Sequence, residues 1–267
     1  MQLNGKIAVV TGASMGIGEA IAQLFIAEGA KVVLASRDLG RVEQAKTSIA
    51  SKVPGSADRL LAVACDVRRR EDLERLLSIT VGRYGRVDIW VNNAGFGMVD
   101  SVQRMDMDEC RRMFDTNLFG AVTAMQVVIP KMREQGSGAI VNISSVAGHI
   151  AVPYMAAYGA TKHALNCFTK AARLELRNSG VQINNVCPGY VKTDFSANVV
   201  RGGDNIGVAG SVKRGITADR VAAAVLKAYL KNKREVVVPW TDRVTIGLYR
   251  ILPSVFEWGM MKVMKKN

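Results

Sequence analysis

Short apolar runs alternate with longer amphipathic stretches along most of the chain, and this alternation restricts the possible fold more than any other feature. The apolar runs, rich in Val, Ile, Leu and Ala, cover residues 7–11, 31–35, 60–64, 87–91, 139–143, 181–186 and 235–238. The stretches between them have the period of helices and cover residues 16–28, 38–52, 71–83, 106–134, 155–178 and 217–231. Strands that alternate with helices form parallel sheets, and continuously apolar strands are covered on both faces. The sequence therefore predicts an α/β fold with a single doubly wound parallel sheet and helices on both faces.

The length of 267 residues suits one large α/β domain. We assign residues 1–239 to this domain, and residues 240–267, which follow the last predicted strand, to an apolar and basic extension of it. Residues 192–215 are rich in Gly, Asn and Ser and predict a long loop, which in a compact domain is usually functional. Ligands of doubly wound sheets bind beyond the carboxyl ends of the strands. We therefore expect the functional residues at that edge.

The chain is strongly basic, because 36 Lys and Arg residues stand against 23 Asp and Glu residues and give a net charge of +13. Residues 200–267 alone hold 13 basic and 5 acidic side chains. A basic surface can meet nucleic acid, anionic lipid or an anionic ligand. Aromatic residues are not interleaved with the basic ones and no nucleic-acid motif is present, so we expect no nucleic-acid partner.

Cysteine and histidine usage argues against a metal protein. Two histidines are too few for a usual zinc site, and no C-x-x-C pair is present, so we expect no metal and free thiols in a reducing compartment. The chain enters a predicted strand a few residues after Met1 without a secretory signal, and no apolar run reaches the roughly 18 residues of a membrane span. These features predict a cytoplasmic protein. The four cysteines are Cys65, Cys110, Cys167 and Cys187.

A glycine-rich turn joins the first predicted strand to the first predicted helix. Its glycines allow a tight turn and let the backbone approach a diphosphate without clashes from Cβ atoms. The N–H groups and the dipole of the helix start then favour the anion. A tight turn without a ligand is the alternative, but the place of the turn between a strand and a helix favours a phosphate cradle. The segment reads Thr11-Gly12-Ala13-Ser14-Met15-Gly16-Ile17-Gly18.

Tyr158 and Lys162 are four residues apart within a predicted helix, and they therefore lie on one face of it. An ammonium group beside a tyrosine hydroxyl favours the phenolate. Tyrosine titrates near pH 10, so working at pH 7 requires a pKa lower by about 3 units, or ~4 kcal/mol. One exposed ammonium does not supply that much, and a second cation in a water-poor site is needed as well.

Further motifs stand in a fixed order along residues 5–239. They include Asn92-Asn93-Ala94-Gly95 after the fourth predicted strand, and Ser145, which precedes Tyr158 by 13 residues. Together with T-G-x-x-x-G-x-G, Y-x-x-x-K and the helix residue Asn117, this set resembles the short-chain dehydrogenase/reductase family. The resemblance implies a Rossmann-type fold and an enzyme that moves a hydride between a nicotinamide cofactor and a carbonyl or alcohol.

The resemblance also implies a catalytic role for four residues. Tyr158 is expected to be the general acid in reduction and the general base in oxidation. Ser145 is expected to donate a hydrogen bond to the substrate oxygen, although the neighbouring Ser144 is a rival for this role. Lys162 is expected to lower the pKa of the tyrosine and to bind the ribose hydroxyls. Asn117 is expected to hold a water that connects Lys162 to solvent.

The resemblance implies the cofactor contacts as well. In the family the Asn-Asn-Ala-Gly turn lies near the adenosine, a pair that matches Asp66 and Val67 contacts the adenine, and a P-G-x-x-x-T segment, here 188–193, packs against the nicotinamide. The expected cofactor contacts are Gly12, Ser14, Met15, Gly16, Ile17, Gly18, Ser36, Arg37, Asp66, Val67, Asn93, Ala94, Gly95, Tyr158, Lys162, Pro188, Gly189, Val191 and Thr193.

The residues after the second predicted strand favour NADP over NAD. NAD-specific members place an acidic residue at the position of Ser36, where it accepts hydrogen bonds from the ribose. Ser36 does not repel a 2′-phosphate, and Arg37 can bind one through a charge-assisted contact. Two features point the other way. Met15 stands where many NADP-dependent members have a basic residue, and Asp38 would take the acidic position in a register shifted by two.

The predicted substrate contacts are Ser145, Tyr158, Tyr190 and His149, and a position of His149 on a surface loop fits the sequence equally well. Glycines and apolar residues in loop 192–215 predict a lid that excludes water from the substrate. The loops that build the substrate pocket of the family are apolar here, so we expect an apolar carbonyl or alcohol as substrate. Their apolar residues are Phe96, Met98, Val152, Tyr154, Tyr190 and Phe195.

Three functions remain open for such a chain. The first is reduction or oxidation of a lipophilic substrate such as a ketone, a ketosteroid or a lipid-like carbonyl, the second is beta-ketoacyl reduction, and the third is non-catalytic nucleotide sensing. A sensor has no reason to retain all four catalytic positions. Ketoacyl reductases typically end soon after the last strand, whereas this chain continues for 27 residues beyond Trp240. Both observations favour the first function.

The segment 240–267 predicts two short helices separated at Pro253, because proline suits a first helical turn and breaks a helix interior. An apolar face next to lysines suggests either contact with anionic lipid at a membrane surface or packing across the interface of a homodimer or homotetramer. The predicted face comprises Leu252, Phe256, Met260 and Val263, and the lysines are Lys262, Lys265 and Lys266.

Overall fold

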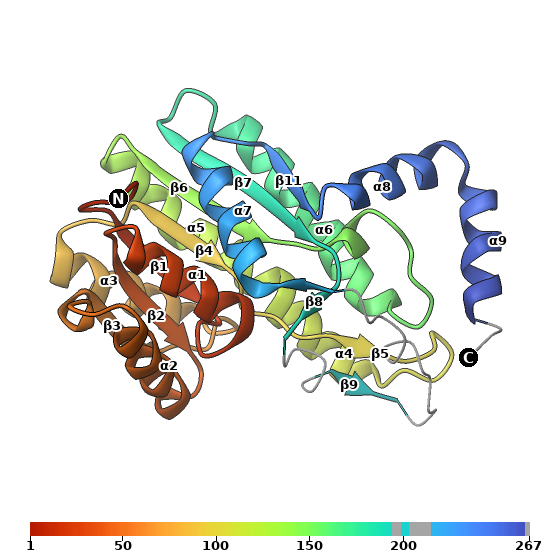
Figure 1. Cartoon of the computed structure of the whole chain (residues 1–267), viewed down its shortest axis with the longest axis horizontal. Helices are drawn as coiled ribbons and strands as arrows, with labels where there is room; N and C mark the ends of the chain where they lie inside the picture. Colours follow the sequence, from red (N-terminus) through yellow and green to blue (C-terminus); the bar gives the residue numbers. More distant parts are fainter. Residues whose placement is uncertain (194–198, 203–214, 265–267) are drawn as a thin grey trace.

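The computed structural model describes residues 1–193, 199–202 and 215–264. Within these residues a sheet of seven parallel strands has the order β11-β7-β6-β4-β1-β2-β3 (Figure 1). The order reverses its direction between β1 and β4, which is where ligands bind in doubly wound sheets. The strands are β1 (Ile7–Thr11), β2 (Lys31–Ser36), β3 (Leu60–Ala64), β4 (Ile89–Asn92), β6 (Gly138–Ile143), β7 (Val181–Pro188) and β11 (Glu235–Val238).

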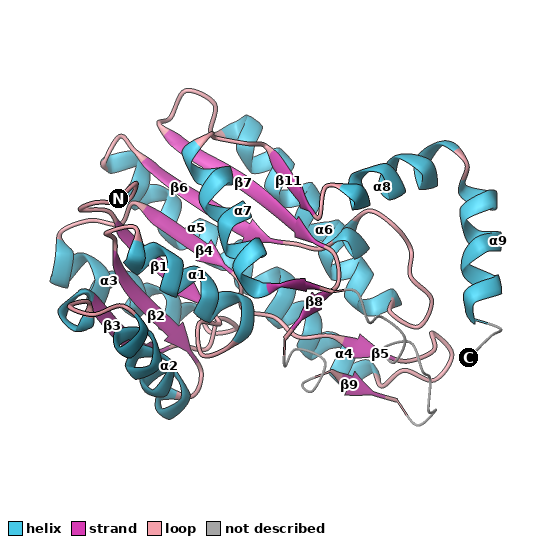
Figure 2. Ribbon diagram, in the orientation of Figure 1, coloured by secondary structure: helices cyan, strands magenta, loops and turns pink. Residues whose placement is uncertain are grey.

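Helices cover both faces of this sheet, as the continuously apolar strands predict (Figure 2). One core cluster joins the sheet to α1 (Gly16–Ala27), α2 (Leu39–Lys52) and α7 (Ala218–Leu230). The other cluster joins the opposite face to α3 (Arg70–Tyr84), α5 (Gly120–Glu134) and α6 (Ala156–Glu175). The predicted fold, a single doubly wound parallel sheet between two helical layers, is confirmed.

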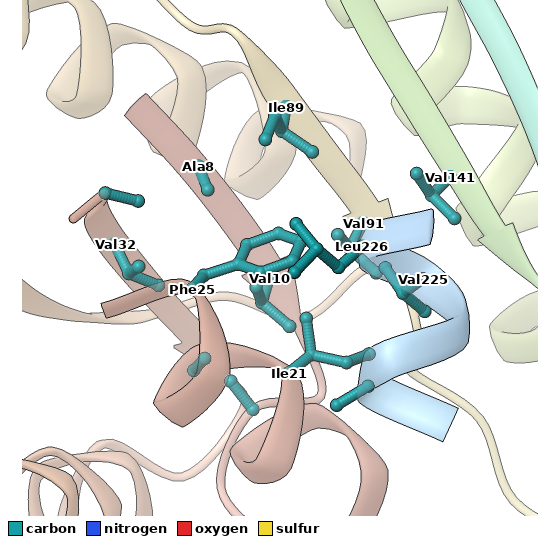
Figure 3. Close-up of a cluster of buried hydrophobic side chains, with 14 of the residues drawn as sticks. Ala8, Val10, Ile21, Phe25, Val32, Ile89, Val91, Val141, Val225 and Leu226 are labelled. Atoms are coloured by element: carbon teal, nitrogen blue, oxygen red, sulfur yellow. The ribbon is translucent and has the colours of Figure 1, made fainter. Parts of the chain in front are cut away.

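Strand β1 shows how one sequence serves both layers, because successive side chains of a strand point to opposite faces. Val10 belongs to the cluster under α1 and α7, whereas Val9 belongs to the cluster on the other face. Figure 3 shows Phe25 and Ile21 of α1 and Leu226 of α7 gathered over Val10. Full burial of a side chain as large as that of Phe25 stabilises the fold by about 2–3 kcal/mol. The packing holds the start of α1 at the carboxyl end of β1.

The stretch predicted as one helix at 106–134 is divided in the structure. It consists of α4 (Met107–Phe114), a π-helical turn η2 (Asp115–Phe119), and α5. The apolar periodicity continues through this region, so the sequence pattern does not reveal the wider turn. Such turns are frequent at functional sites. Here the wider turn carries Asn117, one of the predicted catalytic residues.

One short strand pair joins the two ends of the predicted substrate loop, and a second pair holds a point inside it. Strand β8 (Val191–Lys192) pairs with β10 (Ile216–Thr217), and β9 (Val200–Arg201) pairs with β5 (Met98–Val99). The lid predicted for residues 192–215 falls mostly on 194–198 and 203–214, which lie outside the described residues. Short helical turns also occur elsewhere, as η1 (Ala57–Arg59) and η3 (Val146–Gly148).

The C-terminal segment forms two helices that extend from the end of β11, at the opposite edge of the molecule from β3 (Figure 1). They are α8 (Thr241–Ile251) and α9 (Pro253–Met264), and they are separated at Pro253 as predicted. Ile246 of α8 packs in a small cluster with Val146 and Ile150. Among the described residues, no helix combines the length and the apolarity that a membrane crossing requires.

Candidate active site

A cavity of about 750 Å³ lies at the carboxyl ends of the central strands. It is lined by the loops that follow β1, β2, β4, β6 and β7 and by the start of α6, and most of the predicted site residues meet there. The predicted residues that line it are Gly12, Ser14, Met15, Gly16, Ile17, Ser36, Arg37, Val67, Asn93, Ala94, Gly95, Ser145, Tyr158, Lys162, Pro188, Gly189, Tyr190, Val191 and Thr193.

Four predicted site residues are not among those that line the cavity. Gly18 lies behind the glycine turn, where an added Cβ would overlap the carbonyl oxygen of Gly12. Asp66 pairs with Arg68, and this hydrogen bond, which outweighs the effect of burial, lowers the pKa of the Asp66 carboxyl. Asn117 and His149 are buried beside the cavity.

The apolar residues expected around the substrate divide in a similar way. Phe96 and Val152 line the cavity, whereas Met98 is buried in a cluster with Cys110 and Met113. Tyr154 is not among the lining residues, and Phe195 lies outside the described residues. The pocket is nevertheless apolar, because further loops supply apolar side chains that the sequence analysis did not single out. These additional lining residues are Val99, Val146, Ile150, Met155 and Val199.

The glycine turn is held open by contacts with the loop after β4. Gly12 has φ of +64°, and a Cβ at this residue would come within 2.8 Å of the Ala94 Cα atom. The Asn93 side-chain amide donates to the carbonyl oxygens of Thr11 and Gly12, both at 3.0 Å. The backbone can therefore approach a ligand at the N-terminus of α1. A backbone cradle of this kind, at a helix start, fits a diphosphate group.

Lys162 is a buried cation within this site. Only 5% of its surface is exposed, and its Nζ atom donates to the carbonyl oxygen of Ile143 at 2.9 Å. Burial lowers the pKa of the Lys162 ammonium to about 8. The Nζ atom also lies 5.7 Å from the centre of the Tyr158 ring. The helix thus presents both side chains to one place, as their spacing predicts.

The surroundings of Tyr158 keep its phenol protonated. Burial raises the pKa of Tyr158 to about 12, although a hydrogen bond with the Ser145 side chain lowers it in part. The Lys162 ammonium is itself desolvated and donates to Ile143, and its expected effect on the pKa of Tyr158 stays a prediction. A protonated phenol is suited to donate a proton.

Ser145 and Ser144 have different surroundings. The Ser145 hydroxyl accepts a hydrogen bond from the Ala147 N–H at 3.1 Å and forms a second hydrogen bond with the Tyr158 side chain. The Ser144 hydroxyl donates to the carbonyl oxygen of Lys162 at 3.4 Å. Both line the cavity, but Ser145 is the serine that contacts the tyrosine hydroxyl. This contact favours Ser145 for the predicted role.

Asn117 ties the π-helical turn to the loop after β4. Its Oδ1 accepts from the Phe96 N–H at 3.0 Å, and its Nδ2 donates to the Phe96 carbonyl at 2.8 Å. Gly95, just before Phe96, is close enough that a Cβ there would lie 3.0 Å from the Asn117 Oδ1. In this structure the Asn117 amide positions the cavity wall, and the predicted contact with a water stays a prediction.

One end of the cavity is basic. Arg37 lines it together with Arg41, which lies in the first turn of α2 and which the sequence analysis missed. Ser36 lies beside Ser14, with 3.3 Å between their Oγ atoms. Asp38 caps α2 by accepting from the Arg41 N–H at 3.0 Å. The sequence contained one signal for Arg41: Asp38 is a typical N-cap residue, and a helix that begins after it puts Arg41 in its first turn, four residues after Arg37.

Helix α8 adds residues to the cavity lining that no sequence motif indicated. Asp242 and Thr245 both line the cavity. The Asp242 carboxylate lies over Gly189, where any Cβ would overlap it. Burial raises the pKa of the Asp242 carboxyl. The extension after the last strand therefore forms part of the site.

His149 faces away from the cavity into a buried polar cluster. Its Nε2 lies 3.3 Å from the Glu235 carboxylate and 3.5 Å from the Cys187 sulfur, and its Nδ1 lies 3.3 Å from the Arg250 guanidinium. Burial alone would raise the pKa of Glu235, but the contact with His149 lowers it to about 2. His149 is not among the described residues that line the cavity, and its expected substrate contact stays a prediction.

These three groups have metal-ligand chemistry, since the ligand atoms of His149, Cys187 and Glu235 lie within 4.8 Å of one another. However, all three side chains already take part in hydrogen bonds with other residues of the chain. The Asn185 amide donates to both the Cys187 sulfur and the Glu235 carboxylate, at 3.3 Å each. The guanidinium of Arg250 also contacts the other imidazole nitrogen of His149, Nδ1. The cluster is thus a hydrogen-bonded link between β7, β11 and α8.

Known proteins resemble this chain in sequence. Residues 6–203 match the family described as short chain dehydrogenase. A Drosophila melanogaster protein named dehydrogenase/reductase SDR family protein 7-like is 31% identical over 98% of this chain and 81% of its own length. Dehydrogenase/reductase SDR family member 7B of Danio rerio is 33% identical over 95% of this chain and 84% of its own length.

Solved structures resemble it as well. A short chain dehydrogenase/reductase from Burkholderia phymatum in complex with NAD has a TM-score of 0.85 at 26% identity and covers 96% of both chains. A 3-ketoacyl-(acyl-carrier-protein) reductase from Brucella melitensis complexed with NADH has a TM-score of 0.79 at 27% identity, over 88% of this chain and 97% of that one. The match over most of the chain, in a fold whose cavity gathers the family's motifs, shows that this protein belongs to the short-chain dehydrogenase/reductase family of nicotinamide-dependent oxidoreductases.

Proposed function

We propose that this protein is an NADP(H)-dependent oxidoreductase that interconverts a carbonyl and a secondary alcohol on an apolar substrate. One observation carries the proposal. A protonated Tyr158 is hydrogen-bonded to Ser145 and lies next to the buried ammonium of Lys162. It lines the same cavity as Arg37 and Arg41, which we expect to contact the nucleotide.

The chemistry assigned to the protein is proton transfer and charge stabilisation. A bound nicotinamide cofactor supplies the hydride acceptor or donor. In reduction Tyr158 donates its proton to the substrate oxygen, and in oxidation the same phenol oxygen takes the proton back. The Ser145 hydroxyl donates a hydrogen bond to the substrate oxygen, where negative charge grows. Lys162 holds a positive charge near this point and would bind the ribose hydroxyls.

The residues of the cavity fit a dinucleotide. The glycine turn at the start of α1 would hold the diphosphate, and Pro188, Gly189 and Thr193 would hold the nicotinamide end. Arg37 and Arg41 present two guanidinium groups beside Ser36, and this arrangement supports a 2′-phosphate and hence NADP. Two similar structures contain NAD or NADH, so the preference for NADP rests on the residues of this chain.

The position of Asp38 supports the same preference. A carboxylate at the second strand end would favour NAD by accepting from the ribose. The Asp38 carboxylate instead caps the N-terminus of α2, and Asp38 is not among the cavity-lining residues that the structure describes. The alternative register considered for the sequence, with Asp38 at the ribose, therefore has no support from the local geometry.

An apolar carbonyl or alcohol fits the remaining part of the cavity. Phe96, Val152 and Met155 line it, and Tyr190 contributes an exposed ring at its edge. A solved levodione reductase is similar to this chain with a TM-score of 0.77 at 28% identity over 88% of it. A cyclic or extended lipophilic ketone is therefore our proposed substrate class.

Beta-ketoacyl reduction is the second candidate, and the similarity to the Brucella melitensis 3-ketoacyl reductase favours it. The extension after β11 argues for the first candidate, because Asp242 and Thr245 of α8 line the cavity. A purely sensory function is less well supported, since Tyr158, Ser145 and Lys162 are brought together.

We also propose that the chain forms a homodimer or homotetramer, as members of its family commonly do. Exposed aromatic side chains on the helical layer of the sheet, Phe119 and Phe168, support such an interface. Four free cysteines, of which three are buried, support a reducing, cytoplasmic location.

The proposed function is tested by measuring NADPH and NADH oxidation with a panel of ketones, aldehydes, ketosteroids and a beta-ketoacyl thioester. We expect turnover with at least one apolar ketone, and faster turnover with NADPH than with NADH. Turnover restricted to the beta-ketoacyl thioester would favour the second candidate. Binding of nucleotide without turnover of any carbonyl or alcohol would favour a sensor.

A further inference from the structure

Helices α8 and α9 expose a series of large apolar side chains. On α8 and at its start these lie at Trp240, Val244, Leu248 and Ile251, with spacings of four, four and three that place them on one helix face. On α9 they are Val255, Trp258 and Met261. Trp240 is 72% exposed, Ile251 is 78% exposed and Trp258 is 57% exposed. We refer to residues 240–267, of which the structure describes 240–264, as the C-terminal arm.

The inner side of the arm is already packed against the protein. Ile246 of α8 is buried, and the rings of Tyr249 and Phe256 meet edge to face with 5.3 Å between their centres. Phe256 and Met260, which the sequence analysis placed on the outward docking face, are half-buried. The exposed apolar side chains of α8 and α9 are therefore additional to this packing, and the described part of the chain leaves them uncovered.

Helix α9 has little support from the rest of the chain. It has 12 residues, a length at which an isolated helix is marginal in water. In the described structure α8 is the element that it packs against to a substantial extent. Water therefore surrounds a short helix with exposed Val255, Trp258 and Met261 side chains, and covering them would stabilise it.

The charges on the arm are mostly positive. The segment 240–267 contains five basic residues and two acidic ones, and one of the acidic ones, Asp242, lines the cavity. The ammonium of Lys262 lies 3.6 Å from the centre of the Trp258 ring, so that a cation and an aromatic ring occupy the same surface. The other basic residues are Arg243, Arg250, Lys265 and Lys266.

We propose that the C-terminal arm docks on the surface of an anionic lipid bilayer. Exposed tryptophan and aliphatic side chains bordered by Lys and Arg have the composition of helices that lie in a membrane interface. The apolar side chains would enter the boundary between headgroups and acyl chains, while the basic side chains contact anionic headgroups. The helices lie on the bilayer and do not cross it.

Charge decides between a bilayer and a second copy of the chain as the occupant. Each arm carries an excess of three positive charges, and the whole chain carries +13. Two such arms placed against each other would repel, whereas an anionic surface attracts each of them. The proposal is independent of the catalytic assignment, since Trp240, Ile251 and Trp258 are not among the residues that line the cavity.

Flotation of the full-length protein with lipid vesicles tests the proposal. We expect binding to phosphatidylcholine vesicles that contain phosphatidylglycerol, little binding to phosphatidylcholine alone, and weaker binding as the salt concentration rises. The double variant Ile251→Ser, Trp258→Ser should bind at least about tenfold more weakly. Lys262→Gln should weaken binding by about fivefold, because each lysine near an anionic surface contributes about that factor.

Leu174→Ser is the matched control, since Leu174 is 75% exposed but lies on α6, outside the arm. It should bind as the unchanged protein does. Far-ultraviolet circular dichroism and the unfolding temperature verify that each variant is folded. Failure of the unchanged protein to float with phosphatidylglycerol at low salt would overturn the proposal, as would equal binding by the double variant. If the protein does not float and the double variant has a smaller sedimentation coefficient, a second copy covers the arm instead.

Discussion

The Nζ atom of Lys162 lies 5.7 Å from the centre of the Tyr158 ring, and burial favours the neutral form of both side chains. Burial lowers the pKa of Lys162 to about 8 and raises that of Tyr158 to about 12. The protein thus holds a protonated phenol beside an ammonium whose charge is disfavoured by burial and is only partly compensated by the hydrogen bond to Ile143. An anionic group bound nearby would be attracted by that charge, and a neutral ribose hydroxyl could accept a hydrogen bond from the ammonium.

This relationship predicts how stability depends on pH. The pKa of Lys162 is lowered from 10.5 to about 8, so between these values the unfolded chain binds more protons than the folded one, and stability rises with pH. The shift corresponds to about 3 kcal/mol as an upper limit. The free energy of unfolding of the unchanged protein, relative to that of Lys162→Met, should therefore increase as the pH is raised from 8 toward 10.5.

Urea unfolding of both proteins across this pH range measures the difference. Lys52→Met, at an exposed lysine of α2, is the control, because it removes an ammonium that is not buried. A Lys162 difference that does not change with pH would contradict the burial argument.

The close packing of the glycine turn gives a second prediction. A Cβ at Gly18 would overlap the Gly12 carbonyl oxygen and come within 2.6 Å of the Asn93 amide nitrogen. Gly18→Ala should therefore displace the turn, destabilise the protein by about 1–3 kcal/mol and weaken nucleotide binding. Gly82→Ala is the control, because its Cβ would meet open space on α3 and alanine favours helix by about 0.5–1 kcal/mol.

Thermal unfolding and fluorescence titration with NADPH check both variants. We expect a lower unfolding temperature and weaker binding for Gly18→Ala only. Unchanged NADPH affinity in that variant would show that the turn does not hold the diphosphate.

Local patterns were sufficient for much of the fold. The observed bounds of β1, β3 and β11 equal the predicted runs, because strands that helices cover are mostly apolar and end where polar or turn residues begin. Strand β1 is buried throughout, whereas β11, at the edge of the sheet, is half-buried. The glycine turn and the tyrosine–lysine pair were likewise predictable, since both depend on residues close in sequence.

Features that depend on the path of the chain in space were not predictable. The orientation of His149 toward Cys187 and Glu235 requires the register between β7 and β11. The place of Asp242 over Gly189 requires the direction that the chain takes after β11. No periodicity or spacing in the sequence encodes either contact, because each joins residues that are dozens of positions apart.

A third prediction concerns the choice of nucleotide. Arg37→Ala and Arg41→Ala should each lower kcat/KM for NADPH by about tenfold or more and change kcat/KM for NADH little, since a charged hydrogen bond contributes about 1.5–3 kcal/mol. Steady-state kinetics with both cofactors give the ratio. Arg83→Ala, at an exposed arginine on α3, should leave the ratio as it is. An unchanged ratio in both cavity variants would remove the support for NADP.

The most direct test of the central claim is single-turnover reduction of an accepted ketone by Tyr158→Phe. The phenylalanine ring retains the packing but has no proton to donate and no hydroxyl to contact Ser145. We predict that NADPH still binds with an affinity within about threefold of the unchanged protein, while the rate of hydride transfer falls by at least about 10²-fold, the usual range for loss of a general acid. A rate of hydride transfer close to that of the unchanged protein would contradict the assignment of Tyr158 as the proton donor, and with it the proposed mechanism.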